Sequence, residues 1–136
     1  MKTNWYKKAR QDQPIISFDF DDTIFSLAWS NEENDYERDE DGNAIGTLNE
    51  KIQYVMNRYA GMGCKIIIVS TRKNSTKHEI ENFVREHNLP VSEIHCTDSQ
   101  DKLNTLKTLG VLKHFDDDQH EIDMINEDAS LVGILV

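Results

Sequence analysis

The stretch Phe18-Asp19-Phe20-Asp21-Asp22-Thr23-Ile24 decides how the rest of this 136-residue chain is interpreted. An apolar run typical of a strand, residues 14–20, gives way here to a polar turn. Because side chains alternate faces along a strand, Asp19 and Asp21 are expected to point to the same side at its end. Two carboxylates held together can bind a metal ion, act as nucleophile and acid/base, or do both.

Length and composition predict a single domain over residues 1–136. A chain of this size can bury one core, and 38% hydrophobic with 29% charged residues is typical of globular proteins. The longest aliphatic run, residues 66–69, is far too short to cross a membrane, and no apolar stretch follows the N-terminal positive charges. We therefore expect a cytoplasmic protein with no membrane contact. Trp5 and Tyr6 are expected to pin an N-terminal extension (residues 1–13) to the body, and binding of a partner is the alternative role for them.

Acidic residues dominate the chain, whose net charge is −10. Nucleic acids are bound chiefly by neutralising their phosphates, so this charge argues against extensive nucleic-acid contact. Seven carboxylates and one cation, Arg38, lie within residues 32–41. This pattern predicts a solvated acidic loop over residues 26–46. A calcium-like site and a charge gate over a pocket are the alternatives, although the ligand spacing of a calcium loop is missing.

After the acidic segment, helical and strand-like patterns alternate. Helical spacing of apolar residues marks residues 48–59, 80–87, 103–109 and 122–125, and strand-like runs occupy residues 65–70, 91–96, 111–115 and 131–136. Together with the strand that leads into Asp19, this order predicts an α/β fold. We expect a Rossmann-like, three-layer arrangement, in which helices cover both faces of a parallel five-stranded sheet.

Polar side chains follow four of these predicted strands, where α/β sheets bind their ligands. Each has a simpler explanation on its own, because hydroxyls and aspartates cap helices and a lysine in a first turn usually faces solvent. Their order nevertheless predicts one shared site. The residues are Asp19 and Asp21 after the first strand, Ser70, Thr71 and Arg72 after the second, Asp98 and Lys102 after the third, and Asp116, Asp117 and Asp118 after the fourth.

This arrangement resembles the haloacid dehalogenase-like (HAD) superfamily of phosphohydrolases over residues 15–136. The family pattern consists of Asp-x-Asp-x-Thr, a hydroxyl after an apolar strand, a lysine and an acidic pair. Asp22 stands where many members carry glycine, and the short gaps between motifs leave no room for a cap domain. The matching residues here are Asp19, Asp21, Thr23, Ser70, Lys102, Asp116 and Asp117.

A narrower likeness is to the 3′-phosphatase domain of bacteriophage polynucleotide kinase. It rests on Tyr59-Ala60-Gly61-Met62-Gly63 before the strand at residues 65–70, and on Phe115-Asp116-Asp117. The resemblances imply a Mg²⁺-dependent phosphomonoester hydrolase that acts through an aspartyl-phosphate on a nucleotide or on the 3′ or 5′ terminal phosphate of a nucleic acid. A phosphatase for another small phosphorylated metabolite and a catalytically inactive interaction module of this fold remain as alternatives.

The family resemblance also implies a role for each residue. Asp19 would attack phosphorus and form an aspartyl-phosphate, and Asp21, starting protonated beside other carboxylates, would act as acid and then base. Mg²⁺ would be held by Asp19, Asp21 through its main-chain carbonyl, Asp116 and Asp117, and Lys102 would complete the catalytic set. Substrate phosphate would be bound by Thr23, Ser70, Thr71 and Arg72.

Overall fold

A parallel five-stranded sheet forms the centre of the computed structural model, which describes residues 13–136. Neighbouring strands are parallel throughout, in the order β7-β6-β1-β8-β9. The predicted sheet is thereby confirmed, while the predictions for Trp5, Tyr6 and most of the N-terminal extension lie outside the described residues. The strands are β1 (Ile15–Phe18), β6 (Lys65–Ser70), β7 (Glu93–Cys96), β8 (Lys113–Asp116) and β9 (Val132–Leu135).

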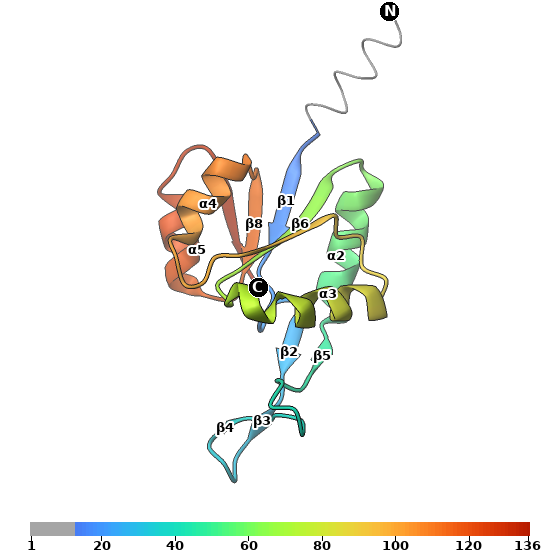
Figure 1. Cartoon of the computed structure of the whole chain (residues 1–136). Helices are drawn as coiled ribbons and strands as arrows, with labels where there is room; N and C mark the ends of the chain where they lie inside the picture. The colour runs from blue at the N-terminus through green and yellow to red at the C-terminus, as the bar shows by residue number, and fades with distance from the viewer. Residues whose placement is uncertain (1–12) are drawn as a thin grey trace, which may run out of the picture.

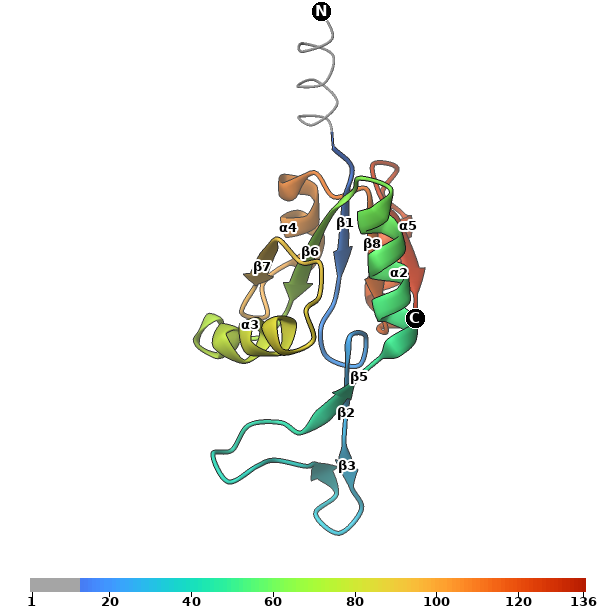
Figure 2. The same cartoon turned by 90° about the vertical axis from the view of Figure 1, so that its right-hand side faces the viewer.

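Helices cover both faces of this sheet (Figures 1 and 2). Ile66 and Ile68 of β6 belong to the core shared with α2 and α3, whereas Ile67 and Val69 pack toward α4 and α5. A strand buried on both faces is therefore a continuous aliphatic run, which explains the sequence of β6. The helices are α2 (Glu50–Gly61), α3 (Lys77–Glu86, preceded by the 3₁₀ turn η1, Asn74–Thr76), α4 (Lys102–Leu109) and α5 (Gln119–Asn126).

Side-chain caps fix where the helices begin, and two of these caps adjoin the predicted site. Asp101 accepts a hydrogen bond from the Asn104 main-chain N–H, which starts α4 at Lys102. Asp118 accepts from two N–H groups in the first turn of α5. Capping therefore places Lys102 and the acidic run after β8 at helix N-termini.

The segment predicted as an acidic loop forms an arm of two short antiparallel ribbons, which we define as residues 25–48. β2 (Phe25–Leu27) pairs with β5 (Gly46–Leu48), and β3 (Trp29–Ser30) pairs with β4 (Asp35–Tyr36). Strands this short leave no period in the sequence, so the regular structure was missed. Figures 1 and 2 show the arm projecting from the edge of the sheet at which β1 ends.

The carboxylates of the arm are exposed, as the solvated-loop prediction requires. All seven acidic residues between positions 32 and 41 face solvent. No three of them converge closely enough to hold a metal ion, which removes support for the calcium-like alternative within residues 13–136.

None of the helices in this described part of the chain has the length and apolar character needed to cross a membrane.

Candidate functional site

A cavity of about 420 Å³ opens at the carboxyl ends of β1 and β8. We call it the catalytic cavity. Five residues predicted to act in catalysis or metal binding meet here, namely Asp19, Asp21, Lys102, Asp116 and Asp117, and Thr71, a predicted phosphate contact, also lines it. The parallel sheet brings them together because its strands all end at one edge, although up to 98 positions separate them in the sequence.

A tight turn after β1 presents Asp19 and Asp21. The Asp19 main-chain N–H donates to the Phe115 carbonyl at 2.8 Å, and the Phe20 carbonyl accepts from three successive N–H groups, those of residues 23–25. Asp22 lies within this turn at a φ of 59°, a left-handed conformation that glycine adopts most easily and aspartate tolerates. The turn explains why glycine or aspartate suits this position.

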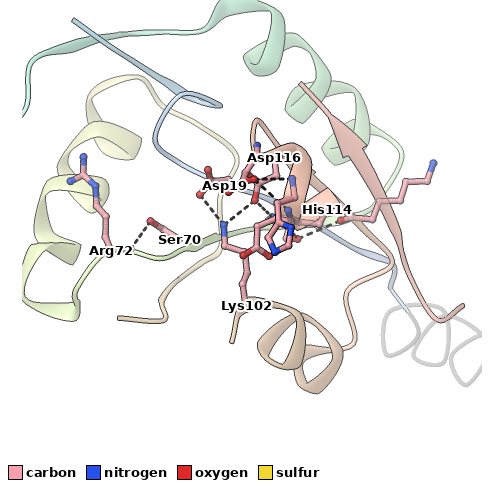
Figure 3. Close-up of polar contacts among 11 residues, drawn as sticks. Asp19, Ser70, Arg72, Lys102, His114 and Asp116 are labelled. Carbon is pink, nitrogen blue, oxygen red and sulfur yellow. Dashed lines mark hydrogen bonds and ion pairs between the residues drawn. The ribbon is translucent and has the colours of Figure 1, made fainter. Parts of the chain in front are cut away.

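Lys102 is buried between two aspartates (Figure 3). Its Nζ donates to Asp116 Oδ2 at 2.9 Å and to Asp19 Oδ1 at 3.2 Å, and the residue is only 4% exposed. Burial alone would lower the pKa of Lys102, but the two carboxylates raise it above its ordinary value. Lys102 is therefore a permanent cation inside the site, not the solvent-facing lysine that its place in a first helical turn would suggest.

The two aspartates beside Lys102 have opposite electrostatic environments. Burial raises the pKa of Asp19 to about 8, with Lys102 opposing the rise and Asp116 adding to it. Burial would also raise the pKa of Asp116, but hydrogen bonds from His114 and Lys102 hold it below its usual value. Asp116 is thus the stable anion of the pair, and Asp19 is the carboxyl that most needs a further cation.

His114 completes the hydrogen bonding of Asp116 and was not predicted from the sequence. Its Nε2 lies 3.0 Å from Asp116 Oδ2, and its Nδ1 lies 2.7 Å from the hydroxyl of Ser17, its register partner on β1. Burial lowers the pKa of His114, so we assign a neutral ring in which Nε2–H donates to Asp116 and Nδ1 accepts from Ser17. The sequence feature that could have identified His114 is its position two residues before Asp116, the acidic residue that ends β8.

Three carboxylates in the cavity can hold a divalent cation. One oxygen from each of Asp19, Asp116 and Asp117 lies within 4.8 Å of the others. Among the described residues, Asp116 Oδ1 accepts a single hydrogen bond, from the Asp118 N–H at 3.1 Å, which leaves one of its lone pairs for a metal ion. An all-oxygen set of this kind fits Mg²⁺, which prefers carboxylate and carbonyl ligands, and the buried Asp19 would gain most from its charge.

Asp21 and Arg72 have partners that differ from the expectation. Asp21 was predicted to sit among carboxylates and Arg72 to be free for phosphate. Instead, the guanidinium donates to both Asp21 oxygens, at 2.8 and 2.7 Å, and approaches Glu79 at 3.6 Å. The planar fork of arginine matches a carboxylate in this bidentate way. Arg72 also lies 5.1 Å over the ring of Phe20, so the pair is held in place.

The remaining predicted phosphate contacts divide into two groups. Thr71 is exposed at the catalytic cavity, as a phosphate ligand should be. Ser70 and Thr23 are fully buried and line no described cavity, and the Ser70 hydroxyl accepts the Arg72 N–H at 3.2 Å. The Thr23 hydroxyl has no hydrogen-bond partner among the described residues. Phosphate binding by Ser70 and Thr23 therefore stays a prediction.

The fold is shared with solved phosphatase structures. The sequence matches no protein-family model and no curated protein sequence. Over 93% of this chain and 70% of the other, it is similar to 3-deoxy-D-manno-octulosonate 8-phosphate phosphatase from Moraxella catarrhalis, solved with magnesium, phosphate and KDO (17% identity, TM-score 0.55). A structure from Streptomyces avermitilis, described as a HAD family hydrolase, matches 90% of this chain and 76% of its own (17% identity, TM-score 0.54).

The chain has the HAD-like fold. A chain of the Pnkp1/Rnl/Hen1 complex shares it at 21% identity and a TM-score of 0.67, over 92% of this chain. This protein spans only 46% of the length of that chain. The HAD-like fold agrees with the resemblance carried by the sequence motifs.

Proposed function

We propose that this chain is a Mg²⁺-dependent phosphomonoester hydrolase that acts through an aspartyl-phosphate on Asp19. The observation that carries the proposal is the cluster at the ends of β1 and β8, in which Asp19 pairs with Lys102 and has oxygens of Asp116 and Asp117 within 4.8 Å. Phosphoryl transfer depends mainly on positioning and charge neutralisation, and this cluster offers a nucleophile, a fixed cation and a cation site within one cavity. The HAD-like fold supports the same reaction class by analogy.

Two steps follow from the residues that line the cavity. A carboxylate oxygen of Asp19 attacks phosphorus and the ester P–O bond breaks, with the leaving oxygen taking a proton from Asp21. Water then attacks the phosphoryl group, giving its proton to Asp21 and releasing phosphate and Asp19. Mg²⁺ held by Asp19, Asp116, Asp117 and the Asp21 main-chain carbonyl would neutralise charge on the phosphate.

Asp21 must exchange partners for this sequence to work, because both of its carboxylate oxygens accept hydrogen bonds from Arg72 and are not free to pass a proton to the leaving oxygen. A phosphate dianion in the catalytic cavity competes for the same guanidinium, since arginine binds phosphate and carboxylate with the same fork. Transfer of Arg72 from Asp21 to the substrate would free the Asp21 oxygens to contact the leaving oxygen and the attacking water. Arg72 would then bind phosphate, as the sequence indicated, but only after substrate arrives.

The substrate that we favour is a nucleotide or the extreme terminus of a nucleic acid. Similarity to a chain of an RNA repair complex supports this class, at 20% identity and a TM-score of 0.69. The exposed acidic arm opposes extended contact with a polyanion. A sugar phosphate is the second candidate, because the Moraxella phosphatase of the same fold was solved with KDO.

Release of inorganic phosphate from p-nitrophenyl phosphate tests the reaction class. We expect Mg²⁺-dependent turnover that chelator abolishes and that Asp19→Asn reduces by several orders of magnitude with unchanged circular dichroism, because an amide is no nucleophile. More than about a tenth of the wild-type kcat in Asp19→Asn would exclude the aspartyl-phosphate route. No turnover of any phosphomonoester would favour an inactive interaction module. A panel of nucleotides, 3′-phosphorylated oligonucleotides and sugar phosphates then decides the substrate class.

A further inference from the structure

A second cavity of about 410 Å³ adjoins the catalytic cavity. We call it the side cavity. The arm contributes Tyr36, Arg38 and Asn43 to its wall, and the segment after β6 contributes Arg72 and Lys73. Asp21, Leu27 and Tyr36 line both cavities, so the two lie side by side. A molecule with its phosphate at Asp19 would therefore have the side cavity next to the part that carries the phosphate.

The two cavities carry opposite charge. Seven carboxylates and one lysine line the catalytic cavity. The side cavity has three cations, and only Asp21 and Glu79 oppose them. Both of these acids are already engaged by Arg72. Arg38 and Lys73 consequently have no carboxylate partner among residues 13–136, although the chain as a whole carries a charge of −10.

Arg38 is held at this wall by the local structure of the arm. Its main chain bridges to Ala44, and its Nη1 donates to the Gly42 carbonyl at 3.2 Å. Gly42 turns the chain there at a φ of 82°, a conformation that strains other residues. Arg38 is the one cation among the seven exposed carboxylates of residues 32–41, so the arm contributes a single cationic group to this wall. Such a wall suits a single additional anion and repels a long polyanion.

We propose that the side cavity binds a second phosphate group, carried by the leaving group of the substrate. This inference rests on the proposed function and narrows its substrate to phosphomonoesters that bear a further phosphate, such as nucleoside 3′,5′-bisphosphates. Arg38 and Lys73 bind the second phosphate through charge-assisted hydrogen bonds. The half-buried ring of Tyr36, at the border between the cavities, offers an aromatic surface to the part of the substrate that joins the two phosphates.

Calorimetric binding to the Asp19→Asn variant in the presence of Mg²⁺ tests the proposal without turnover. The two probes are adenosine 3′-monophosphate and adenosine 3′,5′-bisphosphate, and the measured quantity is the ratio of their dissociation constants. We expect the bisphosphate to bind about tenfold more tightly, and the added substitutions Arg38→Ala and Lys73→Ala together to bring the ratio close to one. The preference should also shrink as salt rises from 50 to 500 mM.

Lys51→Ala and Lys107→Ala in the same background are the matched controls, because both lysines are exposed and neither lines the two cavities. Each should keep the preference for the bisphosphate. Equal affinity for the two probes, or a preference that survives the Arg38 and Lys73 substitutions, would overturn the proposal. Failure of the proposed function gives a different result, namely no phosphate release from any monoester by the wild-type protein.

Discussion

Replacement of Lys102 by methionine should destabilise the fold by about 3–4 kcal/mol in the absence of metal. Removing one partner of a buried ion pair typically costs about 3–5 kcal/mol, because the other charge is left without compensation. The loss of stability has an upper limit, because the buried carboxylate that is left unpaired can become neutral by taking up a proton. Asp116, deprived of Lys102, can take up a proton at about 1.4 kcal/mol per pH unit. Between its ordinary pKa of 3.8 and pH 7, that ceiling is about 4 kcal/mol.

Urea unfolding in EDTA, followed by circular dichroism, measures this loss. Lys107→Met is the matched control on the same helix, since its pair with Asp128 lies at the surface and should contribute little. Lys102→Met combined with Asp116→Asn should recover much of the stability, because the isosteric amide carries no buried charge. Mg²⁺ should stabilise Lys102→Met by binding the folded state. A loss below about 1 kcal/mol for Lys102→Met would refute the reasoning that Lys102 compensates buried carboxylates.

Three further predictions concern the metal and the proton. Asp21→Asn should lose about 10²–10⁴-fold in kcat yet retain its Mg²⁺ affinity in calorimetry, because its main-chain carbonyl is the proposed ligand; full turnover with weakened Mg²⁺ binding would contradict both roles. Because the raised pKa of Asp19, about 8, keeps a proton on the carboxyl that Mg²⁺ must displace, Mg²⁺ affinity should increase from pH 6 to pH 8 and then level off; an unchanged dissociation constant across this range would disprove the proton displacement. His114→Leu should weaken Mg²⁺ binding about tenfold or more by releasing Asp116, and His114→Gln, which can still donate a hydrogen bond, should restore part of it; equal Mg²⁺ affinity in both variants and the wild type would mean that His114 does not position Asp116.

The sequence by itself determined the architecture and the composition of the site. Aliphatic runs alternating with helical patterns specify a parallel sheet, because a strand buried on both faces must be apolar throughout. The polar residues that end these strands, such as Asp19 and Asp116, could be assigned to one edge because parallel strands end together. The exposed character of the acidic segment also followed from composition, since seven charges within ten residues cannot be buried.

Only the tertiary structure decided which of these side chains are partners. Ser17 and His114 meet because β1 and β8 are neighbours in a particular register, and no local pattern encodes a register between segments 97 positions apart. Arg72 pairs with Asp21 for the same reason, since the turn after β1 and the segment after β6 converge only in the folded sheet. The ribbons of the arm, and the side cavity that Arg38 helps to line, depend on strands of two or three residues, which are too short to leave a periodic signal. Local sequence thus specifies which groups reach the edge of the sheet, and the packing of distant segments determines which charges compensate one another there.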